Sequence, residues 1–415
     1  MTFIDLFAGA GGLSEGFIRA GFKPIAHVEM DKAACFSLKT RAAFHYLKYA
    51  GKEDVYISYL KGKISRSELY SHVPEEIKRS IINLSIGPES NDKIHQVIKE
   101  CSGNRKIDLI IGGPPCQAYS LAGRARSQNG MEGDPRNYLY VEYARYLKKY
   151  QPKLFVFENV LGLKSANKGK YLEDMKRLFF KTGYGCKLYT VEANNFGVLQ
   201  NRKRIIILGW RKSMNLNLPD LEAVRFEHDF KVGCLFQDLP RIRSGEGKDR
   251  NDTYSGVNNE YLIISSIRNG SNILTQHISR PHTDQDKEIY RIAAFKWNKE
   301  GARLNYNHLP DHLKTHRNRS SFFDRFKVVA GDLSYAQTVV AHIAKDGHYY
   351  IHPDARQNRS ISVREAARLQ SFPDDYYFEG VKEGSNRTAA FKQIGNAVPP
   401  LMAEKIANLL KSIKF

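Results

Sequence analysis

The residue with the clearest chemical potential in this 415-residue chain is a cysteine that follows two prolines. Cys116 comes shortly after the apolar run 107–111, which predicts a buried strand. The carboxyl ends of such strands form the ligand-binding edge of α/β proteins, and Pro114 and Pro115 make the intervening turn rigid. A thiolate is a strong nucleophile. We therefore predict that Cys116 is a catalytic nucleophile rather than a buried structural thiol.

Two further polar groups lie at predicted strand ends. Glu158 follows the apolar run 154–157, where a partly buried carboxyl could donate a proton. The competing interpretation is a solvated strand-end acid. Arg202 and Arg204 stand just before the run 205–208, and the two-residue period of a strand points both to one side. Two guanidiniums on one side predict contact with an anion or a base.

A glycine-rich turn follows the apolar run 3–7. Gly9, Gly11 and Gly12 come directly before a predicted helix, so a nucleotide-type cofactor could approach the backbone at the helix N-terminus. Glycine turns also occur as plain strand-to-helix connections. Glu29, at the end of the next predicted strand, favours the cofactor interpretation because a carboxylate there can accept hydrogen bonds from ribose hydroxyls. The turn lacks the last glycine of the dinucleotide fingerprint, which favours an adenosine cofactor other than a nicotinamide.

Apolar runs and helical patterns alternate at both ends of the chain. The predicted strands are 3–7, 25–29, 107–111, 154–157 and 204–209, and the predicted helices are 13–21, 138–150, 362–371 and 401–412. This alternation predicts an α/β fold with a mostly parallel sheet covered by helices. From 213 to 337 the sequence is polar with few clear periods. We therefore predict a first segment at 1–212, a second, smaller and irregular domain at 213–337, and a return to the first at 338–415.

Composition and charge narrow the class of protein. Hydrophobic residues make up 42% and charged residues 26% of the chain, which is typical of globular proteins and argues against long disorder. Lys and Arg number 64 against 44 Asp and Glu, and residues 1–212 hold 35 of the basic and 20 of the acidic side chains. Such a charge indicates binding to a polyanion such as nucleic acid, although solubility alone is the competing explanation.

The cysteines and the apolar runs exclude other classes. Five scattered cysteines without a Cys-x-x-Cys pair argue against a disulfide framework and against a metal cluster. The longest apolar runs are far shorter than the ~20 residues of a membrane helix, and no signal peptide is visible. We expect a cytoplasmic protein with no metal and no membrane contact.

Four motifs in a fixed order make the chain resemble the DNA (cytosine-5)-methyltransferases of the bacterial modification type. They are Pro-Pro-Cys-Gln at 114–117, Glu-Asn-Val at 158–160, Gln-x-Arg-x-Arg at 200–204 and Gln-Ile-Gly-Asn-Ala-Val-Pro-Pro at 393–400. The resemblance covers nearly everything outside 213–337. It implies an S-adenosylmethionine-dependent, Rossmann-like methyltransferase domain joined to a smaller target-recognition domain.

The resemblance also implies a cofactor site. S-adenosylmethionine would be bound by Phe7, Gly9, Gly11, Gly12, Glu29, Pro115, Leu139 and Asn396. Glu29 would hold the ribose, and Asn396 would close the pocket from the C-terminal end. The acid that commonly contacts the adenine in this family has no clear counterpart here, and Glu89 and Asp92 are the candidates.

The implied reaction explains the catalytic residue types. Carbon 5 of cytosine is a poor nucleophile, so the thiolate of Cys116 would add to carbon 6 first, with Glu158 bound at ring nitrogen 3. Arg202 and Arg204 would steady the base and the catalytic loop. The target base must leave the duplex stack to be reached. Arg368, in the family's Arg-x-x-x-Arg helix, is expected to be structural.

Two stretches are predicted to contact DNA. Residues 117–137 combine glycines with basic side chains, as a loop that closes over a flipped base would, and the predicted contacts there are Gln117, Ser120, Arg124, Arg126 and Arg136. Residues 303–327 alternate basic side chains with Asn and His, types that bind base edges, and the predicted contacts there are Lys314, Arg317 and Arg319. The competing interpretation of the second stretch is a solvated surface.

Alternatives from other classes remain open at this point. A transfer-RNA cytosine methyltransferase is disfavoured by the long segment 213–337, and an inactive DNA-binding homologue is disfavoured by the intact Cys116, Glu158 and Arg204. The expected partners are double-stranded DNA and a restriction endonuclease that acts on the same site without a stable complex. We expect a monomer.

Overall fold

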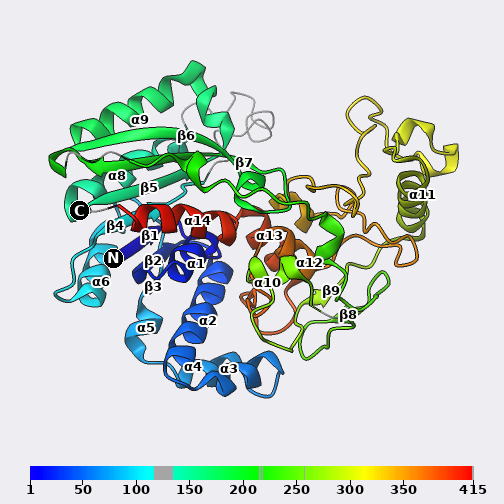
Figure 1. Ribbon diagram of the computed structural model, residues 1–415, viewed down its shortest axis with the longest axis horizontal. Coiled ribbons are helices and arrows are strands. Elements are labelled where there is room, and N and C mark those ends of the chain that lie inside the picture. Colours follow the sequence, from blue (N-terminus) through cyan, green and yellow to red (C-terminus); the bar gives the residue numbers. More distant parts are fainter. Residues whose placement is uncertain (116–133, 215, 217, 257, 414–415) are drawn as a thin grey trace.

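The central element is a seven-stranded sheet. The computed structural model describes residues 1–115, 134–214, 216, 218–256 and 258–413, and within them the strands follow the order β3-β2-β1-β4-β5-β7-β6 (Figure 1). Their bounds are β1 Thr2–Leu6, β2 Lys23–Glu29, β3 Ile81–Asn83, β4 Leu109–Gly112, β5 Leu154–Asn159, β6 Tyr184–Glu192 and β7 Lys203–Arg211. Strand β7 is antiparallel to β5 and β6, whereas the other pairs are parallel. The predicted α/β class with a mostly parallel sheet is confirmed.

Helices cover both faces of this sheet and extend beyond it. Their bounds are α1 Gly12–Arg19, α2 Lys32–Tyr49, α3 Glu53–Leu60, α4 Arg66–Ser71, α5 Glu75–Arg79, α6 Asn91–Ser102, α8 Leu139–Tyr150, α9 Lys170–Lys181, α10 Glu260–Ile264, α11 Asp284–Glu300, α12 Val363–Leu369, α13 Arg387–Asn396 and α14 Pro400–Lys411. A two-stranded sheet is formed by β8 Gly247–Lys248 and β9 His277–Ile278. None of the described helices is long and apolar enough to cross a membrane.

Alternate residues of the strands supply two separate cores. Phe155 and Phe157 face the core that α6, α8 and α9 complete, whereas Leu154 and Val156 face the core that α1 and α14 complete. Figure 1 shows α8 and α9 on one side of the sheet and α1 and α14 on the other. Because both faces are buried, the strands read as continuous apolar runs, which is why the sequence predicts most of them.

The carboxyl ends of the parallel strands meet at one edge. The register pairs Leu6 with Gly112, Gly112 with Phe157, and Glu29 with Asn83. The glycine turn, the end of β2 and the residues after β4 and β5 therefore lie along the same edge of the sheet. This is the edge at which α/β proteins bind ligands.

Part of the segment 213–337 is more regular than the sequence predicts. Most of its described residues form short 3-10 turns, loops and the β8–β9 pair, but α11 is a 17-residue helix capped by Thr283 and ended by Gly301. Its Ile289, Tyr290 and Ala293 enter a small core of their own. The expectation of few periodic elements was wrong there because the apolar residues of 289–297 form a nearly continuous run without a clear helical period.

Buried ion pairs tie distant segments together. The guanidinium of Arg368 on α12 lies 2.5 Å from Asp238 and 2.6 Å from Asp374, and all three side chains are fully buried. Arg364, one turn earlier, donates to the carbonyls of Thr275 and Tyr376. The Arg-x-x-x-Arg helix therefore joins the segment before 337 to the C-terminal part, as its predicted structural role requires.

Candidate active site

Glu158 and Arg204 form an ion pair at the carboxyl edge of the sheet. Arg204 Nε lies 2.8 Å from Glu158 Oε1, and each side chain is 13% exposed. Glu158 is the second-last residue of β5 and pairs in register with Ile206 of β7, two positions after Arg204. The antiparallel pairing of β5 and β7 thus brings together two residues that are 46 positions apart.

The chain just before Cys116 passes directly over this carboxylate. A Cβ at Gly113 would lie 2.6 Å from Glu158 Oε2, so a larger residue at this position would displace the carboxylate. Asn159, the residue after Glu158, makes a weak hydrogen bond from Nδ2 to the carbonyl of Pro114 at 3.4 Å. Pro115 is half-buried. Cys116 itself lies outside the described residues, as do Gln117, Ser120, Arg124 and Arg126.

Arg202 has a different environment from Arg204. It is fully buried, and its guanidinium donates to the carbonyls of Val339, Gly395 and Ala397 at 2.7–3.2 Å. Gly395 and Ala397 stand at the C-terminal end of α13, and Val339 lies earlier in the C-terminal part of the chain. Arg202 therefore clamps the C-terminal segment to the sheet, whereas the contact with Glu158 belongs to Arg204.

The predicted glycine turn has the backbone that a close-lying ligand requires. Phe7, Gly9 and Gly11 have φ of 61°, 55° and 77°, in the left-handed region. A Cβ at Gly12 would lie 2.1 Å from the carbonyl oxygen of Val398, whereas a Cβ at Gly9 would meet no atom within 4 Å. Gly12 thus serves packing against the C-terminal segment, and Gly9 leaves open space above the turn.

Glu29 closes the other side of this turn. Its Oε2 accepts a hydrogen bond from the backbone N–H of Gly9 at 2.7 Å, and its Oε1 accepts one from the backbone N–H of Asp31 at 2.7 Å. Burial raises the pKa of Glu29, and the two N–H groups oppose this rise. Each carboxylate oxygen keeps a second lone pair for a ligand hydroxyl.

Asn83, which the sequence analysis did not single out, lies at the same edge of the sheet as Glu29. It ends β3, pairs in register with Glu29, and donates from Nδ2 to the carbonyls of Glu29 and Met30 at 3.1 and 3.0 Å. Met30 beside it is 65% exposed, an unusual position for a large apolar side chain. Glu89 and Asp92 follow later, before and within α6, so neither is the residue in register with Glu29. The pair Ile81-Ile82 was the available signal, but a three-residue strand is too short to stand out.

Two predicted cofactor residues lie on helices near this edge. Leu139 is the first residue of α8 and is half-buried, and Asn396 is the exposed last residue of α13. Lys392 of α13 places its Nζ 2.8 Å from Oδ2 of Asp31, two residues after Glu29. Residues from the two ends of the chain thus reach the same edge of the sheet.

Asp5 adds a buried acid under the turn. It is 1% exposed, and burial raises its pKa to about 8, with a smaller contribution from Glu29. Ser14 of α1 donates a hydrogen bond to its carboxyl. Asp5 thus links β1 to the first turn of α1 and supports the glycine turn from below.

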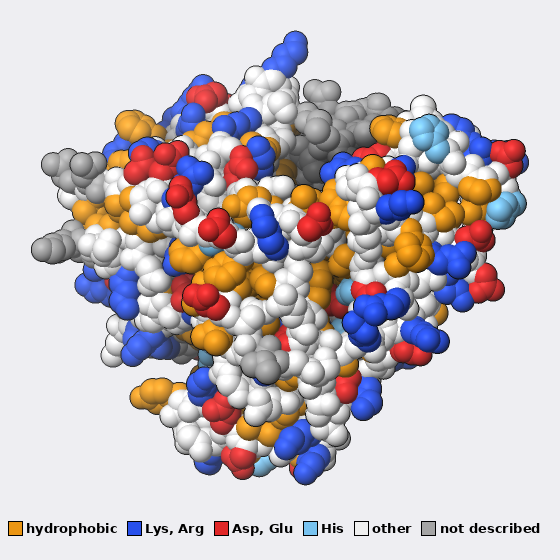
Figure 2. All heavy atoms as spheres, turned by 45° about the vertical axis from the view of Figure 1, so that its right-hand side comes forward, with side chains coloured by type: hydrophobic (Ala, Val, Ile, Leu, Met, Phe, Trp, Pro, Cys, Tyr) orange, Lys and Arg blue, Asp and Glu red, His pale blue; other side chains and the backbone are white. Residues whose placement is uncertain are grey.

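The remaining predicted DNA contacts are dispersed. Arg136 pairs with Asp134 at 2.6 Å in the 3-10 turn η1 (Pro135–Tyr138). Lys314 pairs with Asp311 at 2.6 Å, and Arg319 donates to the carbonyl of Lys314. Arg317 is exposed, and no ion pair of its side chain occurs within the described residues. On the face drawn in Figure 2, basic side chains alternate with acidic ones rather than forming one continuous basic field.

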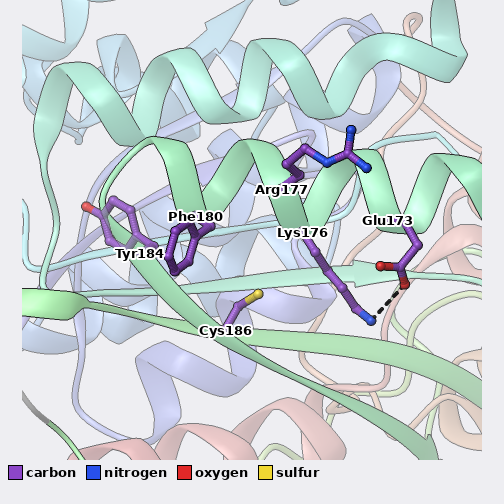
Figure 3. A pocket seen from close by; sticks show the side chains of 6 residues that line it. All are labelled: Glu173, Lys176, Arg177, Phe180, Tyr184 and Cys186. Carbon is purple, nitrogen blue, oxygen red and sulfur yellow. Dashed lines mark hydrogen bonds and ion pairs between the residues drawn. The ribbon is translucent and has the colours of Figure 1, made fainter.

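Other candidate sites are weaker. A hollow of about 400 Å³ between α9 and β6 is lined by Glu173, Lys176, Arg177, Phe180, Tyr184 and Cys186 (Figure 3). Cys186 pairs in register with Gly209 of β7, and Gly209 pairs with Phe155 of β5. Because Phe155 precedes Glu158 by three residues, the hollow lies away from the carboxyl edge of the sheet. Among the residues that the structure describes, no cluster of His, Cys, Asp or Glu could hold a metal ion.

Comparison with known proteins identifies the family. The model of the C-5 cytosine-specific DNA methylases matches residues 1–57 and 81–412. The type II methyltransferase M.Bpa9945I of Bacillus paralicheniformis is 40% identical, over 100% of this chain and 99% of that protein. The type II methyltransferase M1.HphI of Haemophilus parahaemolyticus is 30% identical, over 98% and 86%.

Solved structures agree on the fold. A protein encoded within an E. coli prophage is 22% identical with a TM-score of 0.64, over 100% of this chain and 99% of that chain. The methyltransferase EhMeth of Entamoeba histolytica is 13% identical with a TM-score of 0.55, over 99% and 98%. Taken with the motif geometry and the family match over most of its length, the chain belongs to the C-5 cytosine-specific DNA methylase family.

Proposed function

We propose that this enzyme transfers a methyl group from S-adenosylmethionine to carbon 5 of a cytosine in a short double-stranded DNA sequence, through a covalent adduct with Cys116. The observation that carries this proposal is the Glu158–Arg204 pair under Gly113, three residues before Cys116. A proton-donating carboxyl and a nucleophile on adjoining strand ends suit addition to a ring carbon next to a ring nitrogen.

The residues at the glycine turn fit the cofactor. Open space above Gly9, the free lone pairs of Glu29 and the exposed apolar surface of Met30 suit an adenosine group with its ribose at the carboxylate. Phe7, Pro115, Leu139 and Asn396 are proposed to complete the site, with the Asn83 amide beside the adenine. When bound there, S-adenosylmethionine supplies the methyl group as an electrophile.

The chain's own residues prepare the cytosine. The Cys116 thiolate forms a bond to carbon 6, and the electron pair of the 5,6 double bond becomes available at carbon 5. Glu158 holds ring nitrogen 3 by a hydrogen bond and offsets the charge that develops there, while Arg204 keeps the carboxyl in place. After methylation, a water molecule takes the proton from carbon 5, the electron pair of that C–H bond restores the 5,6 double bond, and the bond from carbon 6 to sulfur breaks to release the thiolate.

Access to carbon 5 requires that the cytosine leave the base stack. Residues 117–137 are proposed to close over the extruded base, with Arg124, Arg126 and Arg136 on phosphates. Residues 213–337 are proposed to read the DNA sequence, whereas 1–212 and 338–415 form the catalytic domain. The names of the relatives support a role as the modification enzyme of a restriction–modification pair. We further propose that the enzyme acts as a monomer, without a stable complex with the endonuclease.

The proposal is tested with DNA that carries 5-fluorocytosine. The target is first mapped as 5-methylcytosine in the DNA of a host that expresses the chain. A duplex with 5-fluorocytosine at that position should trap the wild type covalently, since fluorine does not leave as a proton.

Cys116→Ala is the matched variant. It should bind the duplex but form no adduct and no product. A hundredfold lower rate corresponds to an activation free energy only ~2.7 kcal/mol higher. Turnover by Cys116→Ala above about one hundredth of the wild-type rate would therefore exclude the cysteine as nucleophile. Absence of 5-methylcytosine with the wild type would exclude the proposed reaction.

A further inference from the structure

The segment that follows Glu158 presents three lysines to solvent. It consists of the 3-10 turns η2 (Leu161–Lys164) and η3 (Ala166–Gly169) and the start of α9. Leu163 and Ala166 are buried and anchor the segment, whereas Lys164, Lys168 and Lys170 are exposed. Apolar anchors thus alternate with outward lysines over ten residues.

The positive charge of these lysines is not compensated by neighbouring acids. In the described parts of the chain none of the three forms an ion pair, and the Nζ of Lys164 donates to the hydroxyl of Thr190 instead. The next acids on α9 are Glu173 and Asp174, which pair with Lys176 and Arg177 at 3.1 and 3.9 Å. The segment is therefore a local site of uncompensated charge.

The backbone around Lys168 is held in an unfavourable conformation. Asn167, Lys168 and Gly169 have successive φ values of 46°, 53° and 87°, all in the left-handed region. This region costs roughly 1–2 kcal/mol for each residue that carries a Cβ. Strain of this kind concentrates in segments that contact ligands.

The sheet register places this segment beside the catalytic edge. Thr190, which holds Lys164, pairs with Ile205, and Ile205 pairs with Asn159, the neighbour of Glu158. Adjacent strands lie about 4.8 Å apart, so the Lys164 amine is roughly two strand spacings from the strand of Glu158. A duplex presents one phosphate charge per about 1.7 Å of its axis, so a cytosine bound at Glu158 brings several phosphates within reach.

We propose that Lys164, Lys168 and Lys170 bind the phosphodiester backbone of duplex DNA beside the target cytosine. This inference rests on the proposed function, because it places the cytosine at Glu158. The lysines act as point charges on phosphate oxygens and do not read bases, since their flexible amines lack the fork geometry of bidentate base contacts. Their contribution is therefore independent of DNA sequence and falls with salt.

The test compares two triple variants of the full chain. The first replaces Lys164, Lys168 and Lys170 with Gln. The control replaces Lys52, Lys61 and Lys63 with Gln, which are exposed lysines at both ends of α3, far from α9 (Figure 1). Duplex affinity is measured from 50 to 200 mM salt, for the methylated site and for an unrelated sequence, and thermal unfolding verifies that both variants fold.

The first variant should lower affinity for both duplexes alike. Its log–log salt slope should be shallower by about 0.9 for each phosphate that the lysines no longer neutralise, up to about 2.7. Lys168→Arg should keep the wild-type slope, because it preserves the charge, and the control should keep it too.

Two results would overturn the inference: a slope in the first variant equal to that of the wild type, or a decrease in affinity confined to the methylated site. Failure of the wild type to methylate would overturn the proposed function instead. The salt slopes would still decide the role of the lysines in that case, because they are measured without turnover.

Discussion

Glu158 and Arg204 are held 2.8 Å apart by the antiparallel pairing of β5 and β7, with Gly113 packed against the same carboxylate. The geometry makes Arg204 a positioning residue for Glu158. Because the pair is nearly buried, removal of the guanidinium takes away the ion-pair partner that the carboxyl has among the described residues.

Arg204→Met and Glu158→Gln should each reduce the methylation rate by about 10²–10⁴, the usual contribution of a positioned proton donor. The double variant should be little slower than either single variant, because the two side chains act as a unit. Single-turnover methylation of a fixed duplex measures this, with cofactor affinity as the control. Independent, additive reductions would show that Arg204 acts apart from Glu158.

Gly12→Ala should weaken cofactor binding at least tenfold and lower the unfolding temperature. The new Cβ would lie 2.1 Å from the carbonyl oxygen of Val398, so the C-terminal segment must move away from the turn. Gly87→Ala is the matched control, since a Cβ there meets no atom within 4 Å. Equilibrium binding of S-adenosylmethionine and thermal unfolding provide the readouts, and unchanged values for Gly12→Ala would contradict the packing role.

Arg202→Met should destabilise the fold, in contrast to Arg204→Met. It removes the guanidinium donor of the buried carbonyls of Val339 and Gly395, at about 1–3 kcal/mol for each group, whereas the carbonyl of Ala397 keeps a hydrogen bond from Gln370 Nε2 at 3.3 Å. We expect a decrease of at least about 2 kcal/mol in the free energy of unfolding, measured by urea titration. A loss of methylation with full stability would instead assign Arg202 to the reaction.

Arg317→Ala and Arg319→Ala test base reading by the segment 213–337. If these side chains pair with base edges, each change should relax the preference at one base pair by about 1–3 kcal/mol. Arg317 has the freer side chain, whereas Arg319 is bonded to Lys314 and lies 5.5 Å from the Tyr306 ring centre. Methylation of a library of site variants is the measurement. Equal weakening at all sites would indicate phosphate contacts.

Stability should fall as the pH drops from about 6.5 toward 4. Burial lowers the pKa of His277 to about 4, and its Nε2 donates to the carbonyl of Pro240. The unfolded chain binds a proton near pH 6.5 and the folded chain does not, so the contribution of His277 to stability is complete above pH 6.5 and declines below it. At pH 5, one such histidine lowers the free energy of unfolding by about 2 kcal/mol relative to its value above pH 6.5.

His277→Gln should therefore reduce the slope of the unfolding free energy against pH between 4 and 6.5. The reduction should correspond to the uptake of up to one proton fewer on unfolding. His72→Gln, at an exposed position, should leave the dependence unchanged. Urea titrations at several pH values measure both. An identical slope for His277→Gln and the wild type would show that His277 takes up its proton in the folded state.

The sequence by itself determined the family, the α/β class and the strand-end positions of the glycine turn, Glu29 and Glu158. The reason is local: strands buried on both faces are continuous apolar runs, and the residues that follow them stand at a sheet edge whatever the rest of the chain does. The same local information could not locate β3, whose three residues are too few to form a pattern, and so the position of Asn83 was missed.

Only the tertiary structure decided which partners these residues take. Arg202 and Arg204 are equivalent in the sequence, but the structure gives them different acceptors. Arg202 clamps the C-terminal segment, because its acceptors are backbone carbonyls within 339–397, whereas Arg204 holds Glu158 of β5. The contact of Gly113 with Glu158 and the position of Lys164 beside the site are likewise set by strand register. Register depends on packing between segments far apart in the chain, and no local pattern contains it.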